Sequence, residues 1–318
     1  MNDKKWIKFR MFIWSLIAVL LSIFLIFNVF SWGGSYFNNN IMNWGFSTNN
    51  NMKKINEYEF DDIDSIKNIT TNINNSDVVL GKNNKDNIKV IVKSNKGIKD
   101  KNSIKADKNL DTVSIEDKSN NTKGKFFGIT KGIFMEVEVL IPDSYKGNLN
   151  IDNNVGDLSF VSSLEFHNVD INVKTGDVDI NQKLIANKLV INNKVGDLDA
   201  KTLIVKDLSI EGKTGDIEIE ELEGKGSLDS DVGDIDCGIE KLSGDLKLRS
   251  RVGDVDISIN RDLSFLFEGN KKMGEIESDL EFNNVSQSSK HFSGKYGKTP
   301  NNLISVDVKT GDIGIYQK

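Results

Sequence analysis

The sequence predicts an all-β fold: a single-stranded, β-helix-like β-solenoid with rungs of about 20 residues, preceded by one transmembrane α-helix. Three observations predict it. They are an uncharged apolar run near the N-terminus, a Gly-Asp motif at near-constant spacing, and alternating apolar residues on both sides of each motif. A rung is one turn of the chain, made of a strand, a corner at Gly-Asp and a second strand.

The apolar run covers residues 11–30 and contains no charged residue. A helix of about 20 residues is roughly 30 Å long, which matches the hydrocarbon thickness of a bilayer. Four cations precede the run, and they predict a cytoplasmic N-terminus: Lys4, Lys5, Lys8 and Arg10. We therefore expect a cytoplasmic segment at 1–10 and a transmembrane signal anchor at 11–32. A cleaved signal peptide is the alternative.

The rest of the chain is then expected outside the cytoplasm. Residues 33–54 are rich in Asn, Gly and Ser, which is typical of a flexible linker. Residues 55–318 are predicted to form the extracytoplasmic β-solenoid. Its predicted parts are degenerate opening rungs at 55–148 with a looped polar stretch at 93–132, regular Gly-Asp repeats at 149–278, a loop at 279–303 and a final rung at 304–318.

The repeated motif is Val or Thr followed by Gly-Asp, with one Met-Gly-Glu variant. Its glycines are spaced by 20, 20, 19, 18, 20, 21 and 37 residues: Gly156, Gly176, Gly196, Gly215, Gly233, Gly253, Gly274 and Gly311. Asn75-Ser76-Asp77 resembles a corner in which Ser replaces Gly. Near-constant spacing of this kind is the signature of stacked structural repeats.

Apolar residues alternate with polar ones around each glycine, as expected for strands with one buried face. Before Gly176 they are Val169, Ile171 and Val173, and after it they are Val178 and Ile180. Counted from the glycine, the apolar residues lie an odd number of positions before it and an even number of positions after it. A straight strand cannot shift by one residue without exposing its buried face, whereas a corner can, and glycine tolerates the backbone angles that a corner needs.

Composition excludes several classes of protein. The net charge is −6, and because the N-terminal segment is basic, the remainder is more acidic still. An acidic domain repels phosphate backbones, so no nucleic-acid partner is expected. The one cysteine, Cys237, excludes an intrachain disulfide and a Cys-based zinc site, and it lies where other rungs carry a core residue. We predict a buried, unreactive thiol.

These residues resemble the bacterial "putative adhesin" family of β-strand-repeat proteins, whose function is unknown. The resemblance covers about residues 55–318. It depends on the strand that ends at Pro142, on the Gly-Asp series, and on the closing segment from Gly297 to Ile313. It implies an exported or single-pass extracytoplasmic protein, in some members one linked to envelope stress. The family has no established catalytic residues, so the resemblance carries none over.

Two acidic columns follow from the stacking of the rungs. They are formed by Asp177/Asp179, Asp197/Asp199, Asp216/Glu218, Asp234/Asp236, Asp254/Asp256 and Glu275/Glu277. A basic column lies two residues before each glycine and is interrupted by Asp231: Lys174, Lys194, Lys213, Arg251, Lys272 and Lys309. One hypothesis is a surface that binds a metal ion such as Ca²⁺, or a cationic polymer. Its weak metal candidates are Asp177, Asp179, Asp197, Asp199, Asp234, Asp236, Asp254 and Asp256. The other is structural: the first Asp accepts a backbone N–H at the corner, and the basic column offsets the repulsion.

No enzyme is predicted, since neither His167 nor His291 lies in a catalytic motif and the regular spacing of the carboxylates is typical of a structural role. No catalytic residue and no cofactor are expected. The leading hypothesis is a membrane-anchored, non-enzymatic surface binding or scaffolding protein whose partner is a cell-wall polymer, a surface ligand or another envelope protein. The alternatives are an accessory or regulatory component of an envelope-stress response, a scaffold that assembles end to end, and a polysaccharide-active enzyme.

Overall fold

The computed structural model describes residues 52–95, 104–118 and 135–318. The expected cytoplasmic segment, signal anchor and nearly all of the linker lie outside these residues, so they stay predictions. No helix in the described ranges is long and apolar enough to cross a membrane. In the unit from Met52 to Lys318 the described residues form strands and one 3-10 helix, which confirms the all-β prediction.

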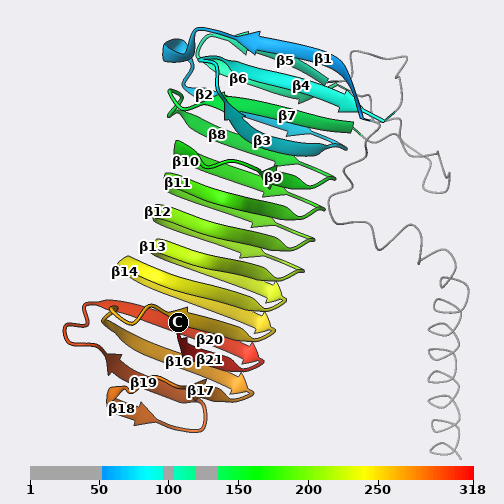
Figure 1. Cartoon of the computed structure of the whole chain (residues 1–318). Helices are drawn as coiled ribbons and strands as arrows, with labels where there is room; N and C mark the ends of the chain where they lie inside the picture. Colours follow the sequence, from blue (N-terminus) through cyan, green and yellow to red (C-terminus); the bar gives the residue numbers. More distant parts are fainter. Residues whose placement is uncertain (1–51, 96–103, 119–134) are drawn as a thin grey trace, which may run out of the picture. The chain divides into compact units, whose positions relative to one another are not determined.

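Parallel rungs form the middle of this unit, and Figure 1 shows them as a ladder in green and yellow. Strands that lead into the Gly-Asp corners form one face, called the pre-corner face, and strands that leave them form the post-corner face. The first contains β8 (Asn148–Asn153), β10 (Leu164–Val173) and the second parts of β11 (Val178–Asn193), β12 (Leu198–Gly212), β13 (Ile217–Val232) and β14 (Ile235–Val252). The second contains β9 (Leu158–Phe160), the first parts of β11 to β14, and β15 (Val255–Ile259).

Equivalent residues of successive rungs lie side by side in register. Ile171 pairs with Ile191, which pairs with Ile210, which pairs with Leu228. All four are at most 1% exposed, because alternate side chains of both faces fill the space between them. Each such side chain stabilises the fold by roughly 1.5–3 kcal/mol. The predicted period of two and the stacking of rungs are therefore confirmed.

The N-terminal end contains two further rungs, but their order in space differs from the order in the sequence. It comprises β1 (Lys53–Phe60), η1 (Ile63–Ser65), β2 (Asn68–Ile73), β3 (Asp77–Asn83), β4 (Ile88–Ser94), β5 (Ile104–Asn109), β6 (Thr112–Asp117) and β7 (Met135–Pro142). The rung β2–β3 turns at Ser76, as predicted, and lies directly on β8 and β9. Strands β6 and β7 lie outside it, also in parallel.

Antiparallel strands close this end. On the post-corner face β4 pairs with β7 and β1 with β4, and on the pre-corner face β5 pairs with β6. The prediction that 55–148 consists only of opening rungs is therefore wrong in part. The looped stretch expected at 93–132 is also wrong in part, since β5 and β6 lie within it. Their exposed sides are rich in Lys and Asp, so the sequence looks polar there although Ile104, Val113 and Ile115 are buried.

The C-terminal end also departs from the order of the sequence. It comprises β16 (Phe265–Met273), β17 (Ile276–Ser278), β18 (Asn283–Gln287), β19 (His291–Tyr296), β20 (Asn302–Thr310) and β21 (Ile313–Gln317). Strand β20 lies between β14 and β16, and β21 lies between β15 and β17. The expected final rung, 304–318, is therefore the last in sequence but is enclosed by two others (Figure 1).

The predicted loop at 279–303 is wrong, because this segment forms an antiparallel hairpin against the outermost rung. Strand β19 pairs with β16, and β18 pairs with β19. The physical reason is an aromatic cluster that covers the end of the core. Phe282 packs against Phe265 and Phe267 with ring centroids 6.1 and 5.7 Å apart, and Phe292 lies 6.0 Å from Phe267.

Candidate functional site

The corners lie in register and place their glycines in one column. In spatial order the glycine column is Gly156, Gly176, Gly196, Gly215, Gly233, Gly253, Gly311 and Gly274. Their φ angles are between 121° and 144°, a region that is almost closed to residues with a Cβ. A Cβ on Gly215 would lie 2.1 Å from the carbonyl oxygen of Gly196. Both the backbone angle and the close approach of the next rung therefore require glycine.

The residue after each of these glycines, together with Asp77 after Ser76, forms a hydrogen-bonded ladder, called here the first acidic column. In spatial order its members are Asp77, Asp157, Asp177, Asp197, Asp216, Asp234, Asp254, Asp312 and Glu275. At each step a backbone N–H donates to the Oδ1 atom of the preceding member. The donor–acceptor distances range from 3.0 Å at Asp157 and Asp177 to 2.7 Å at Asp312 and Glu275.

This ladder gives four of the weak metal candidates a structural task. Asp177, Asp197, Asp234 and Asp254 each accept a backbone N–H of the next rung. The structure thus supports the hypothesis that the first aspartate caps the corner. It extends that hypothesis as well, because the N–H comes from the neighbouring rung and not from the same corner.

The second acidic column lies two residues further along and has no such ladder. Its members pair in register across the post-corner face: Asp179, Asp199, Glu218, Asp236 and Asp256. Beyond Asp256 the column continues with Gly314 and Glu277. It contains the other four weak metal candidates, Asp179, Asp199, Asp236 and Asp256, about 4.8 Å apart per rung.

Partial burial and, after it, the crowding of like charges change the acidity of this column. Partial burial, followed by the charges of Asp199, Asp177 and Asp157, raises the pKa of Asp179 to about 6. Burial and the neighbouring carboxylates also raise the pKa of Asp199, Glu218, Asp236 and Asp256. No group of three or more His, Cys, Asp or Glu side chains in the described part is arranged to hold a metal ion.

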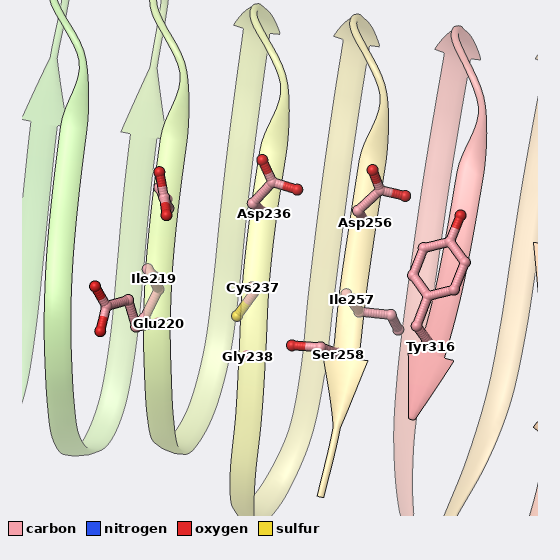
Figure 2. A pocket seen from close by; sticks show the side chains of 10 residues that line it. Ile219, Glu220, Asp236, Cys237, Gly238, Asp256, Ile257, Ser258 and Tyr316 are labelled. Atoms are coloured by element: carbon pink, nitrogen blue, oxygen red, sulfur yellow. The ribbon is translucent and has the colours of Figure 1, made fainter. Parts of the chain in front are cut away.

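An open hollow of about 330 Å³ lies over the Glu218, Asp236 and Asp256 part of this column. Figure 2 shows the side chains that line it. Its polar lining comes from Glu218, Glu220, Asp236, Asp256, Ser258 and Tyr316. Gly238 lies in the same lining and pairs in register with Ser258, and a Cβ on it would lie 2.0 Å from the carbonyl oxygen of Glu220. At its edge the amino group of Lys318 donates to the Glu220 carbonyl at 3.0 Å. Sequence reasoning missed this hollow, since it depends on Tyr316 from the displaced last rung.

Cys237 lies beneath the hollow and is 2% exposed. Burial, more than the charge of Asp236, raises the pKa of its thiol to about 12. A thiol of this kind is protonated at neutral pH and is a poor nucleophile. The prediction of a buried thiol is confirmed.

The two histidines lie apart from this hollow. His167 Nδ1 is 2.9 Å from the side-chain nitrogen of Asn187, and His291 Nδ1 is 2.9 Å from Asn270 Oδ1. Each ring thus contacts an asparagine of a neighbouring strand.

The basic column lies on the other side of the glycines and is exposed along its length. Arg251 contacts Asp231, the acidic member of the same column, at 3.3 Å. Within the described residues none of the lysines, Lys174, Lys194, Lys213, Lys272 and Lys309, forms an ion pair. The basic column was expected to offset the repulsion between the carboxylates. Its lysines do not do so through direct ion pairs.

Between the basic column and the glycines lies a row of exposed Val, Thr and Met side chains that sequence reasoning missed. This apolar row is Val155, Thr175, Val195, Thr214, Val232, Val252, Thr310 and Met273 in spatial order. The exposed fraction is 48% at Val195 and 61% at Met273. Strand alternation would bury this position, but the corner begins one residue earlier and turns the side chains outward.

Comparison with known proteins gives one family and a set of solved structures. The Toastrack DUF4097 family model matches residues 66–316. None of the curated proteins matches the chain.

Three of the solved structures illustrate the likeness. A "putative cell adhesion protein" from Clostridium sporogenes is 13% identical with a TM-score of 0.31, and the match covers 84% of this chain and 100% of that one. A "putative adhesin" from Bacteroides fragilis is 14% identical with a TM-score of 0.46, covering 83% and 96%. A "putative lipid binding protein" from Parabacteroides distasonis is 15% identical with a TM-score of 0.39, covering 84% and 97%. The resemblance predicted from the repeat is confirmed by the family match, and the chain belongs to the Toastrack DUF4097 family.

Proposed function

We propose that this protein is a non-enzymatic binding or scaffolding module of the cell envelope, held at the outer side of the membrane by its N-terminal segment. The observation that carries the proposal is the register of the rungs. It repeats the same side chains along both outer faces and along the corner, as in the second acidic column. Solenoids use extended, repeating surfaces of this kind for binding.

The interior supports the same conclusion. Side chains from both faces fill the space between them, with Leu184, Leu203 and Leu222 fully buried in successive rungs. A ligand therefore meets the outer surface. Substrate and cofactor pockets of enzymes are usually concave and bury most of their ligand, whereas the hollow over Gly238 is open and acidic.

The partner that suits a repeating surface is itself extended or repetitive. A cell-wall polymer, another surface ligand and the strand or helix of an envelope protein all meet this condition. Nucleic acid does not, since the net charge is −6 and the post-corner face carries a continuous column of carboxylates.

The test is photo-crosslinking in intact cells. A photoreactive amino acid is placed at Asn181 on the post-corner face, and in a matched variant at Lys188 on the pre-corner face, both of which are exposed. Capture of wall polymer or of a surface ligand by one variant, but not by the other, is the expected result. Specific capture of a regulatory membrane protein would contradict a binding or scaffolding role and favour a role in an envelope-stress response.

Protease treatment of whole cells tests the placement. We expect residues 55–318 to be digested without lysis, whereas a cytoplasmic control protein stays intact. Protection of these residues until lysis would overturn the outer location.

A further inference from the structure

We propose that two copies of this chain pair side by side along their Gly-Asp corners, with their long axes parallel and a two-fold axis along the stack. This goes beyond binding an outside ligand, because the partner is a second copy. The surface is the corner strip, defined as the basic column, the apolar row and the first acidic column together. Its three rows follow one another across four residues of each rung, as in Lys194, Val195, Gly196 and Asp197.

The corner strip exposes large apolar side chains to water in successive rungs, which is uncommon. Val155, Val195, Val232 and Val252 are 41–48% exposed, and Met273 is 61% exposed. The row is continuous, because Thr175, Thr214 and Thr310 occupy the intervening rungs and are exposed too. Exposed Val and Met side chains in one row, with Thr methyl groups between them and charges on both sides, are typical of an interaction surface, unlike single exposed residues.

Charge selects one way of pairing two strips. A two-fold axis parallel to the stack places the apolar row of one copy on that of the other, and it places each basic column opposite the partner's first acidic column. A two-fold axis across the stack places basic column on basic column, which is repulsive. The parallel arrangement is complementary at every rung with a Lys or Arg in the basic column, and the exception is the rung of Gly233, where Asp231 faces the second copy's Asp234. Isologous contact of this kind is the commonest form of oligomer.

The lysines are available for such contacts. Lys174, Lys194 and Lys213 occupy three successive rungs, and none of them forms an ion pair within the described residues. In the first acidic column the Oδ1 atom of Asp197 accepts a backbone N–H of the next rung. The second oxygen of each such carboxylate is left to meet a cation.

The same rows argue against an anionic polymer as the occupant. The basic column has an acidic member, Asp231, whereas the first acidic column has an acid at every rung. The carboxylates lie only three residues from the cations, so both columns act on anything bound along the strip. A polyanion would therefore meet as much repulsion as attraction.

The size of the strip predicts weak pairing. Seven steps of about 4.8 Å by a width of about 12 Å give roughly 400 Å² on each copy. Two such surfaces total about 800 Å², below the roughly 1,200–2,000 Å² of stable complexes. We expect transient dimers that a covalent link can trap.

The experiment places a single cysteine in the apolar row of the full-length chain and measures disulfide-linked dimer after mild oxidation. In the parallel arrangement every position of the row faces its own copy, so Val155→Cys, Thr214→Cys and Met273→Cys should all form dimers. Asn181→Cys, exposed on the post-corner face, is the matched control and should not. The wild type, with only the buried Cys237, sets the background. Thermal unfolding verifies that each variant is folded.

Charge reversal provides the second measurement. In the Thr214→Cys background, Lys194→Glu with Lys213→Glu should lower the dimer yield at least fivefold, whereas Lys188→Glu with Lys206→Glu, on the exposed pre-corner face, should leave it unchanged. Dimers only at Thr214→Cys, in the middle of the row, would replace the parallel arrangement by an antiparallel one. Absence of dimers at all three positions would overturn the proposal, as would protection of the row by added polyphosphate, which would identify a polyanion as the occupant.

Discussion

The two acidic columns lie two residues apart on the same strands, yet their carboxylates have different surroundings. In the first column each Oδ1 accepts a backbone N–H, as Asp216 does from Asp234 at 2.8 Å. In the second column Asp199 and Glu218 lie side by side in register, and both have a raised pKa. One column ties the rungs together, whereas the other places like charges next to each other.

The glycine column explains the difference. Because Gly233 has no Cβ, the carboxylate of Asp216 can lie close to its backbone, where a Cβ would be 2.9 Å from Oδ1. The second column lies past the corner on a regular strand, whose N–H groups are taken by the parallel ladder. Its carboxylates therefore lie next to each other and partly buried, so this column destabilises the stack and is the one left for function.

The largest expected effect is at the corner itself. Gly215→Ala should lower the free energy of unfolding by at least about 3 kcal/mol, because the new Cβ lies 2.1 Å from the Gly196 carbonyl and φ is +131°. Denaturant unfolding measures this change. The matched control is Gly212→Ala in the same rung, where the Cβ would be 3.3 Å from the end of the Ile217 side chain and adjacent rungs carry Asn193 and Ser230.

The control should change the free energy of unfolding by less than about 1 kcal/mol. Equal losses in Gly215→Ala and Gly212→Ala would show that the glycine column is not what separates the two acidic columns.

A smaller effect is expected within the ladder. Asp216→Ala should lower the free energy of unfolding by about 1–2 kcal/mol, because the N–H of Asp234 loses its acceptor. Asp216→Asn keeps an oxygen at that place and should lower it less. Glu218→Ala, in the second column of the same rung, should be neutral or stabilising, since it removes a charge next to Asp199 and Asp236.

Chemical denaturation of Asp216→Ala, Asp216→Asn and Glu218→Ala in the same buffer measures the three free energies of unfolding. A loss at Glu218→Ala as large as that at Asp216→Ala would contradict the assignment of different tasks to the two columns.

Regular parts of the fold could be predicted because their physics is local. The alternation around Gly176 and the phase shift at the corner require only neighbouring residues, and they predicted the strands, the buried Cys237 and the acidic columns. The structural task of the first aspartates was also within reach, since short acidic side chains commonly accept backbone N–H groups at turns.

The two ends could not be predicted for the opposite reason. The insertion of β20 between β14 and β16 depends on which strands pair at long range, and the sequence of Asn302–Thr310 is the same whichever rungs enclose it. The hairpin over 283–296 is polar outside, and its buried contacts are made by aromatic residues without a regular period. The hollow beside Tyr316 follows from this displaced rung, so it could not be predicted either.

The pH dependence of stability sharpens the comparison further. The pKa of Asp179, about 6, lies above its ordinary value of 3.8, so the folded state binds this proton more tightly than the unfolded state. The free energy of unfolding should therefore fall as pH rises from 3.8 to about 6 and stay low above that range. Asp179→Asn should remove part of this fall and stabilise the protein at pH 7 by about 1 kcal/mol, after allowance for solvent screening.

Unfolding at several pH values measures this effect. The matched control is Asp152→Asn on the pre-corner face, where adjacent rungs already carry Asn72 and Asn172. It should leave the pH profile unchanged. A profile of Asp179→Asn that is the same as that of the wild type would show that neither burial nor the neighbouring carboxylates raise the pKa of Asp179.

The smallest expected effect is that of ionic strength. Added NaCl screens the repulsion between neighbours of the second column, so it should stabilise the wild type by a few tenths of a kcal/mol more than it stabilises the double variant Asp199→Asn with Asp236→Asn. The difference between the two proteins cancels the general effects of salt on folding. If NaCl stabilised the wild type and the double variant equally, water alone would screen these carboxylates. The second acidic column would then differ from the first only in lacking the ladder.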